Sequence, residues 1–517
     1  MKRNLNLLLL AFLLAISGMT VRAQENKPAD KPDDKAGDKT KEQKPPAPPE
    51  EKISQTKHSV HVGGQEIKYT ATAGTILLKE EDGKPKASVF FVAYTKDDVP
   101  DPSKRPVMFT FNGGPGSSSV WLHLGVFGPR RVQMGDVGSL APPPYKLVEN
   151  ENSMLDVTDL VFIDPVSTGY SRAVPGEAPK QFHGIEEDVA SVGEIIRLYT
   201  TRYKRWASPK FLAGESYGTT RAAGLSGYLQ QRDGLYLNGI ILISSILNFE
   251  TAEFDTGNDL PYILCLPTYT ATAWYHKKLS ADLQQDLQKA LAESKEFASG
   301  EYTLALMHGD SYEGAARAGI ARKLARLTGL SAEFIEQNNL RLRLDRFTKE
   351  LLRSEHRTVG RLDSRFKGID ADDAGDQPEY DPSYAAIRGP YTAMLNDYLR
   401  SELKFESDLP YEILTGRVQP WSFARYENRY VNVAETLRQA MTQNPDLKVF
   451  VAKGYYDFAT PFYAAEYTFN HLGLDPSLRD HLSTAYYEAG HMMYIHQPSF
   501  LKLKQDIAAF IRGASPK

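Results

Sequence analysis

Residues 209–230 read PKFLAGESYGTTRAAGLSGYLQ, and this stretch decides the fold that we expect for the chain. Residues 211–213 form an apolar run that is typical of a buried strand. The next five residues, 214–218, fit the pattern G-x-S-x-G with Ser216 at the centre, and residues 219–230 have a helical composition. A strand, a tight turn and a helix are the context in which this pattern presents a nucleophilic serine at the end of a sheet.

Short patterns also occur by chance, so the rest of the chain must supply the other parts of a site. A serine hydroxyl is a poor nucleophile unless a base accepts its proton and a third group orients that base. In a sheet of this kind the chain order is serine, then an acid, then histidine. Asp457 follows the apolar run 447–452, and His491 follows the run 484–487 in a glycine-flanked loop. We therefore expect Ser216, Asp457 and His491 to form a catalytic triad.

Other residues fit this order less well. Taken singly, Asp457 has the alternative role of capping a turn, and His491 that of a surface-loop residue. Asp164 also ends an apolar run, but it precedes Ser216, so we interpret it as structural. Four further histidines lack a position just after a strand in a glycine loop: His123, His183, His481 and His496.

The composition indicates a large globular protein. The 517 residues are 41% hydrophobic and 24% charged, which suffices for one large domain with insertions or for two to four small domains. The formal net charge is −4 and no long basic block occurs, so nucleic acid is not an expected partner. The single cysteine, Cys265, excludes an intramolecular disulfide, and its apolar neighbours predict a buried thiol rather than a nucleophile.

The N-terminus has the pattern of an export signal. Lys2 and Arg3 precede the apolar run 5–16, and small residues at positions 21 and 23 predict cleavage after Ala23. We therefore expect residues 1–23 to be a signal peptide and the mature protein to be periplasmic or secreted; an uncleaved anchor is the alternative. Residues 24–52 are rich in Pro, Lys, Asp and Glu and predict a disordered tether. No later segment is apolar and long enough for a stable membrane span.

From residue 53 onward the pattern predicts an α/β fold. Alternating residues on both sides of Gly63 and Gly64 indicate an antiparallel hairpin. Within 53–250, apolar runs alternate with helical segments, which predicts a mainly parallel sheet with helices on both faces. Residues 251–415 are mostly helical and charged, and we expect them to form a cap inserted into the sheet domain. The sheet pattern resumes over residues 416–517.

A second glycine-rich segment, residues 112–119, directly follows the apolar run 106–111. Its glycines lack the spacing of nucleotide-binding loops, so it fits an oxyanion loop better than a phosphate loop. A metal site is not expected, because His58 and His61 have no third ligand. No cofactor is implied by any motif.

Five ordered blocks resemble the signatures of the serine carboxypeptidases, the S10 peptidase family with an α/β-hydrolase fold. The resemblance covers residues of about 90–250 and 416–512. The blocks are NGGPGSSS at 112–119, FIDPVSTGYS at 162–171, GESYG at 214–218, GYYD at 454–457 and GHM at 490–492.

The resemblance implies a role for each matching residue. Ser216 would attack the scissile carbonyl, His491 would act as base and then as acid, and Asp457 would hold the imidazole. The main-chain N–H groups of Gly114 and Tyr217 would form the oxyanion hole.

In this family the terminal carboxylate of a peptide is bound at positions that correspond here to Asn112, Gly113 and Glu215. A neutral glutamic acid can donate a hydrogen bond to that carboxylate, which is why the family favours acid pH. A second glutamate usually shares the proton, but the matching position is Val126. Glu215 would then lack a like charge that raises its pKa. We expect weaker carboxylate recognition or an optimum nearer neutral pH.

The function expected from these residues is a serine-type carboxypeptidase that cleaves C-terminal residues from peptides through an acyl-enzyme on Ser216. An esterase or acyltransferase with the same triad is the first alternative, and a non-catalytic binding protein is the second. Ser117 replaces a cysteine that is usually disulfide-bonded in the family, which suggests a bacterial-type member. The sequence specifies neither the side-chain preference nor the oligomeric state.

Overall fold

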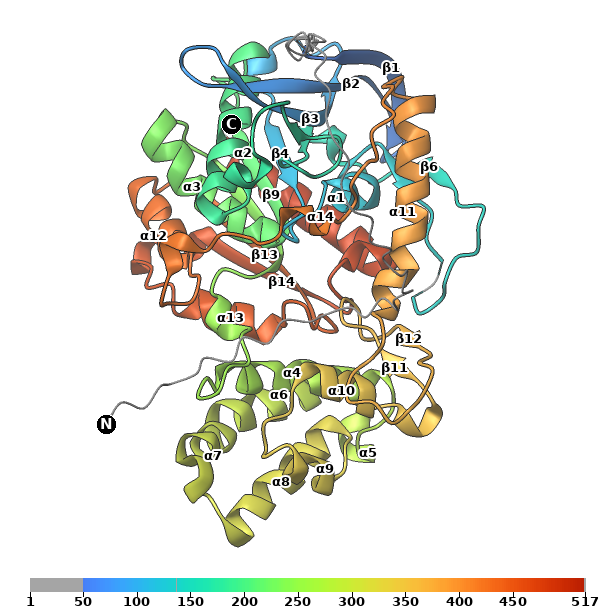
Figure 1. The fold of residues 1–517 in the computed structure, drawn as a ribbon, viewed down its shortest axis with the longest axis vertical. Coiled ribbons are helices and arrows are strands. Elements are labelled where there is room, and N and C mark those ends of the chain that lie inside the picture. The colour runs from blue at the N-terminus through green and yellow to red at the C-terminus, as the bar shows by residue number, and fades with distance from the viewer. Residues whose placement is uncertain (1–49, 136, 516–517) are drawn as a thin grey trace, which may run out of the picture. The chain divides into compact units, whose positions relative to one another are not determined.

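The computed structural model describes residues 50–135 and 137–515. The expected signal peptide, 1–23, and most of the expected tether, 24–52, lie outside the described residues. The chain from β1 onward is organised around one large sheet with helices packed on it (Figure 1).

The sheet has ten strands in the order β1-β2-β3-β7-β4-β9-β10-β13-β14, with β8 paired to β3. The first three strands and the β3–β7 pair are antiparallel, whereas every pair from β7 to β14 is parallel. This confirms the expected α/β-hydrolase type of sheet with N-terminal antiparallel strands. The strands are β1 Ile53–Val62, β2 Gln65–Lys79, β3 Pro85–Lys96, β4 Val107–Phe111, β7 Asp159–Ile163, β8 Arg172–Ala173, β9 Lys210–Ser216, β10 Gly239–Ser245, β13 Lys448–Gly454 and β14 Leu482–Tyr487.

Helices cover both faces of this sheet because its central strands are apolar on both sides. In β10, for example, Ile241 and Ile243 belong to one hydrophobic cluster and Ile240 and Leu242 to the other. The first cluster includes residues of α11 (Pro382–Ser401) and α14 (Gln497–Ala514). The second includes residues of α2 (Ile185–Arg202), α3 (Tyr217–Asp233) and α12 (Ala434–Gln443).

A separate hydrophobic cluster holds the helices that follow β10. It runs from Tyr262 to Val359 along the chain and also contains Phe458. We refer to residues 260–359 as the helical insertion, which in Figure 1 gathers beyond the carboxyl edge of the sheet. Its helices are α4 Leu260–Tyr275, α5 Ala281–Gln284, α6 Leu287–Phe297, α7 Thr303–His308, α8 Gly314–Thr328, α9 Ala332–Gln337 and α10 Leu344–Glu350.

The expected cap segment, 251–415, therefore contains two kinds of structure. Its last long helix, α11, packs Tyr391, Leu395 and Tyr398 into the cluster of the sheet and not into that of the helical insertion. A separate cap thus corresponds better to the helical insertion than to the whole segment, and the exact boundaries stay a prediction. Short elements complete the chain: α1 Val120–Leu122, α13 Phe462–Asn470, and the pairs β5 Arg130–Val132 with β6 Leu147–Glu149 and β11 Thr358–Val359 with β12 Lys367–Gly368.

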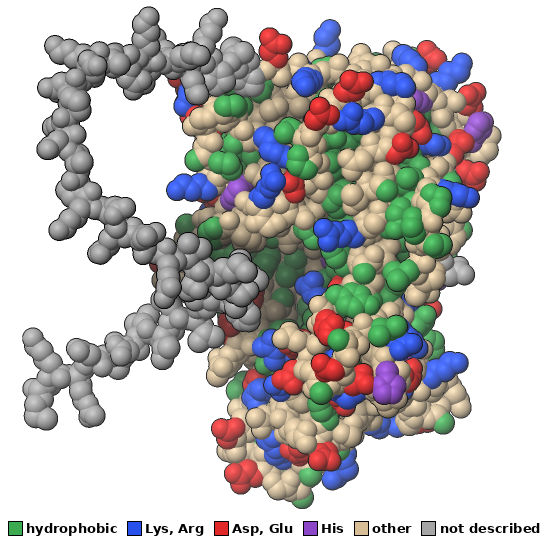
Figure 2. All heavy atoms as spheres, turned by 45° about the vertical axis from the view of Figure 1, so that its right-hand side comes forward, with side chains coloured by type: hydrophobic (Ala, Val, Ile, Leu, Met, Phe, Trp, Pro, Cys, Tyr) green, Lys and Arg blue, Asp and Glu red, His purple; other side chains and the backbone are tan. Residues whose placement is uncertain are grey.

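The surface carries charges of both signs. On the face shown in Figure 2, basic and acidic side chains are interspersed, which fits the small net charge of the chain. Within residues 50–135 and 137–515, no helix combines the length and the hydrophobicity that a membrane span requires.

Candidate active site

The expected site residues follow strands that end at one edge of the sheet. Asn112 follows β4, Ser216 ends β9, and β4 and β9 are neighbours in the sheet. Asp457 follows β13 and His491 follows β14, which are also neighbours. Because all four strands are parallel, their carboxyl ends bring together residues that are up to 379 positions apart.

Ser216 occupies a sharp turn between β9 and α3. Its backbone has φ 61° and ψ −132°, a conformation that residues with a Cβ rarely adopt. Such strain is typical of a nucleophile that is held away from both the strand and the helix. Helix α3 begins at Tyr217, so its free N–H groups point toward the same place.

Asp457 and His491 form a buried ion pair. Nδ1 of His491 lies 2.8 Å from Oδ2 of Asp457, and the two side chains are 6% and 0% exposed. Asp457 also accepts hydrogen bonds from the main-chain N–H of Ala459 at 2.8 Å and of Thr460 at 3.0 Å. Burial lowers the pKa of His491, but the charge and hydrogen bond of Asp457 outweigh burial and raise this pKa above its ordinary value.

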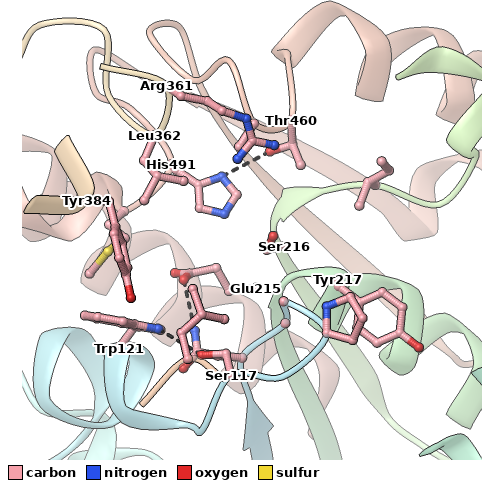
Figure 3. A pocket seen from close by; sticks show the side chains of 18 of the residues that line it. Ser117, Trp121, Glu215, Ser216, Tyr217, Arg361, Leu362, Tyr384, Thr460 and His491 are labelled. Carbon is pink, nitrogen blue, oxygen red and sulfur yellow. Dashed lines mark hydrogen bonds between the residues drawn. The ribbon is translucent and has the colours of Figure 1, made fainter. Parts of the chain in front are cut away.

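The imidazole of His491 leaves its second ring nitrogen free for Ser216. Figure 3 shows the ring between Thr460 and Ser216, with that nitrogen on the side of Ser216. No hydrogen bond joins the Ser216 hydroxyl to the ring among the described residues. In enzymes without substrate, such contacts are often long and shorten in the reactive complex.

The glycine-rich loop after β4 packs against the start of α3. A Cβ on Gly113 would lie 2.4 Å from the main-chain nitrogen of Tyr217, so only glycine allows this approach. Gly114 has φ 102°, in the region that favours glycine. The structure thus brings the expected oxyanion-hole residues, Gly114 and Tyr217, into the same pocket as Ser216.

Asn112 and Glu215 form a buried pair beside Ser216. Nδ2 of Asn112 donates to Oε1 of Glu215 at 2.9 Å, and the Asn112 side chain is oriented by the N–H of Leu122, which donates to its Oδ1 at 3.1 Å. The hydroxyl of Tyr494 donates to the other oxygen, Oε2, at 2.7 Å. Asn112 and Glu215, expected from the sequence as carboxylate-binding residues, thus lie together, and their role stays a prediction; Tyr494 lies in none of the sequence motifs.

The pKa of Glu215 bears on the expectation drawn from Val126. Burial raises this pKa to about 7, although Val126 supplies no like charge. The absence of a second glutamate therefore does not return the pKa to its ordinary range, because burial is the largest cause of the rise and the charge of Asp457 adds to it. Whether carboxylate recognition is weaker, or the pH optimum nearer neutral, stays a prediction. The ring of Tyr494, which donates to Glu215, packs closely against Gly125. A Cβ on that glycine would lie 2.4 Å from the ring, so only glycine leaves room for Tyr494 beside Glu215.

A second buried ion pair supports the glycine-rich loop from below. Nε of Arg221 lies 2.7 Å from Oδ2 of Asp188, and both side chains are at most 2% exposed. Arg221 also donates to the main-chain oxygen of Asn112 at 2.6 Å. No local pattern predicts this contact, because it joins α2, α3 and the loop after β4 through tertiary packing.

Two of the competing residues, Asp164 and His123, have partners of their own. Asp164 accepts from the N–H of Ser119 at 2.9 Å and the hydroxyl of Tyr411 at 2.7 Å, which places it under the end of the glycine-rich loop. His123 bonds Tyr94 at 2.6 Å in the core, and burial lowers its pKa to about 3. Burial raises the pKa of the Cys265 thiol.

These residues line a pocket of about 400 Å³. Asn112, Gly113, Gly114, Glu215, Ser216, Tyr217 and His491 all contribute to it, and Thr460 places the Asp457 loop at its wall. Figure 3 shows Glu215 and Trp121 on one side of the imidazole and Arg361 on the other. Among residues 50–135 and 137–515, no group of three or more His, Cys, Asp or Glu side chains is arranged to hold a metal ion.

The sheet, the strained serine after β9, and the histidine after the last strand define an α/β hydrolase. Comparison with known families identifies a more specific class. The profile of the serine carboxypeptidase family matches residues 65–504, so the chain belongs to the serine carboxypeptidases, the S10 peptidase family.

Two curated relatives match parts of the chain. Serine carboxypeptidase-like 34 from Arabidopsis thaliana is 26% identical over 243 residues, 44% of this chain and 42% of the relative. The pheromone-processing carboxypeptidase KEX1 from Saccharomyces cerevisiae is 38% identical over 156 residues, 28% of this chain and 20% of the relative. The chain thus spans less than half the length of these relatives.

A solved structure of KEX1 from Saccharomyces cerevisiae, described as a prohormone-processing carboxypeptidase, is similar in fold. The match has a TM-score of 0.52 at 17% sequence identity and covers 86% of this chain and 91% of that chain. At this identity the likeness supports the fold alone.

Proposed function

We propose that the protein is a serine-type carboxypeptidase that removes C-terminal residues from peptides. The observation that carries this proposal is the buried Asn112–Glu215 pair next to Ser216, with a Glu215 pKa of about 7. A neutral acid and an amide N–H beside the nucleophile suit a terminal carboxylate, whereas an ordinary ionised glutamate would repel it. Membership of the serine carboxypeptidase family also supports the proposal.

The chemistry follows the usual course of a serine hydrolase. Ser216 Oγ attacks the carbonyl carbon of the last peptide bond, and its proton passes to Nε2 of His491. The N–H groups of Gly114 and Tyr217 stabilise the oxyanion. His491 then protonates the leaving amine, the C–N bond breaks, and an acyl-enzyme remains on Ser216. Water, deprotonated by His491, hydrolyses the ester.

Asp457 contributes by holding His491. Its Oδ2 fixes the Nδ1–H tautomer, and its charge stabilises the imidazolium that forms after proton transfer. The main-chain N–H groups of Ala459 and Thr460 hold this carboxylate in turn. Asp457 therefore contributes most to the raised pKa of His491, and the carboxylate of Glu215 adds to it.

The test is mass spectrometry of a peptide mixture after incubation with the protein, with Ser216→Ala as the control. Loss of single residues from free C-termini, absent in the control and for C-terminally blocked peptides, is the expected result. Ester cleavage without any loss of residues would favour the esterase or acyltransferase alternative. Absence of Ser216 labelling by a fluorophosphonate would favour a binding protein.

We also propose that the protein is exported, with residues 1–23 as its signal peptide. The basic start, the apolar run 5–16 and the small residues before Gln24 support this proposal. N-terminal sequencing of the protein from its native cells is expected to begin at Gln24. A mature protein that still begins at Met1 would contradict it.

A further inference from the structure

One short segment outside the motifs contacts both loops of the acid–base pair. We call residues 361–365 the loop clamp; they lie between the helical insertion and α11. Main-chain hydrogen bonds join the loop clamp to the loops that carry Asp457 and His491. The three bonds are Phe458 N to Arg361 O at 3.1 Å, Ser364 N to Tyr456 O at 3.0 Å, and His491 N to Leu362 O at 2.7 Å.

A buried ion pair within the loop clamp binds the histidine loop from the side. Arg365 meets the Asp363 carboxylate with two nitrogens, at 2.9 and 2.6 Å, and the side chains are only 4% and 5% exposed. The same two side chains also form hydrogen bonds with the main chain of the His491 loop. Gly490 N donates to Asp363 Oδ2 at 3.2 Å, and Arg365 Nη1 donates to Glu488 O at 2.7 Å.

Packing makes this contact close. A Cβ on Gly490 would lie 2.5 Å from the Cβ of Asp363, so the glycine before His491 is required by the clamp. On the other loop, the Phe458 ring packs against the stacked rings of Tyr269 and Phe347 in the helical insertion, at centroid distances of 5.5 Å to each. The insertion therefore helps to build the site rather than only covering it.

The loop clamp is itself anchored on the sheet domain through α11. Arg361 N donates to Oδ1 of Asp381, which precedes α11, at 3.0 Å. Leu362 N and Asp363 N both bond the Ser383 hydroxyl, at 3.0 and 3.2 Å. Since α11 packs into the cluster of the sheet, these bonds fix the clamp relative to β13 and β14.

We propose that Asp363 and Arg365 are positioning residues that hold the His491 loop in register with Asp457. The proposal rests on the proposed serine hydrolase function. A carboxylate and a guanidinium that satisfy each other and two main-chain groups fix the loop more firmly than isolated bonds would. Small displacements matter, because a shift of about 1 Å in a catalytic group can reduce the rate by about 100-fold.

The test compares two Asp→Asn variants. Asp363→Asn weakens the clamp, whereas Asp370→Asn weakens an equally buried pair, Asp370 with Lys349 at 2.5 Å, that bonds neither catalytic loop. We expect both variants to lose stability, but only Asp363→Asn to lower kcat and the rate of Ser216 labelling by a fluorophosphonate, by about 10- to 100-fold. KM should change little.

The pH profile separates positioning from general damage. Three charged groups act on the pKa of His491: Asp457 and Glu215 raise it and Arg361 lowers it. If the contact between Asp457 and His491 weakens, burial dominates and the pKa of His491 falls. The rising limb of kcat against pH should therefore move to lower pH in Asp363→Asn but not in Asp370→Asn. Equal effects of the two variants on kcat and on this limb would overturn the proposal.

Two further measurements keep this test decisive. If Asp363→Asn does not fold, Arg365→Lys keeps the charge but not the paired geometry, and we expect an intermediate loss of labelling rate. Labelling does not require peptide cleavage. The two proposals can therefore fail separately. If Asp363→Asn is labelled more slowly but the wild-type protein cleaves no peptide, the loop clamp is supported and only the proposed carboxypeptidase function is contradicted.

Arg361 supports a second, independent inference about the substrate. Its exposed side chain lines the pocket, and Figure 3 shows it above His491, reaching toward Thr460 on the side opposite to Glu215. Its guanidinium makes no ion pair or hydrogen bond with the described residues, although its main chain is fixed at N and O. The pocket thus holds a guanidinium with no direct ion-pair partner among the described residues.

We infer that Arg361 binds a carboxylate side chain of the substrate, at one of the two residues that flank the scissile bond. An anion there would neutralise a charge that opposes imidazolium formation on His491. Guanidinium groups bind carboxylates with two parallel hydrogen bonds, which makes them selective for Asp and Glu over their amides.

Binding to a Ser216→Ala background tests this without turnover. Peptides with Glu or Gln at the last or the penultimate position are compared, and we expect Glu to bind about 10-fold more tightly at one position. Adding Arg361→Gln should abolish the difference, whereas Arg322→Gln, an exposed arginine of α8 outside the pocket, should not. An unchanged Glu-to-Gln ratio in Arg361→Gln would overturn the inference.

Discussion

Replacing Glu215 with Gln tests the proposed carboxylate site most directly. The neutral acid can donate a hydrogen bond to the terminal carboxylate of a peptide, whereas the ionised form repels it. Gln has nearly the same shape, keeps an N–H donor and does not titrate. The change therefore removes the pH dependence of carboxylate binding while leaving Ser216, Asp457 and His491 in place.

The magnitude follows from the pKa. With a pKa of about 7, about 90% of Glu215 is neutral at pH 6 and about 10% at pH 8. kcat/KM for a free-carboxylate peptide should thus fall about 10-fold relative to a blocked peptide across this interval. At the ordinary pKa of 4.5, only about 3% of Glu215 would be neutral at pH 6, and the fall of kcat/KM would lie in the acid range.

The assay measures kcat/KM between pH 5 and pH 9 for matched peptides with a free or an amidated C-terminus. We expect the wild-type protein to show a falling limb near pH 7 with the free peptide alone. Glu215→Gln should lose this limb. Its rising limb should also move to lower pH, because the ionised carboxylate helps to raise the pKa of His491.

The control is Glu253→Gln, since Glu253 lines the same pocket and burial also raises its pKa. It should behave as the wild type. A falling limb that survives in Glu215→Gln with an unchanged midpoint, or that appears equally with amidated peptides, would refute the reasoning.

Three further outcomes follow from the geometry. Ser216→Ala should abolish fluorophosphonate labelling and lower kcat by roughly 10⁶-fold, and residual labelling at another residue would contradict the assignment. Tyr494→Phe removes a hydrogen bond that lowers the pKa of Glu215, so the falling limb should move above pH 7; a shift to lower pH would be inconsistent. Arg221→Met leaves the buried Asp188 carboxylate without its counter-ion and should reduce the free energy of unfolding by about 3–5 kcal/mol in denaturant titration, and a loss below about 1 kcal/mol would show that the pair is dispensable.

The sequence by itself determined the parts of this protein that depend on local patterns. Apolar runs such as 447–452, the hairpin at Gly63 and Gly64, and the G-x-S-x-G turn each specify their own backbone, because their signal lies within a few residues. The order of these pieces was enough to predict the parallel sheet and the edge where Ser216 and His491 meet.

Only the tertiary structure decided how that edge is held. The Tyr494 bond to Glu215, the Arg221–Asp188 pair and the loop clamp join residues between 33 and 279 positions apart, and no local pattern encodes such contacts. The raised pKa of Glu215 also cannot be read from a local pattern, since it depends on how completely the folded chain excludes water from this side chain. Local chemistry selects the reacting groups, and long-range packing sets their distances and their protonation.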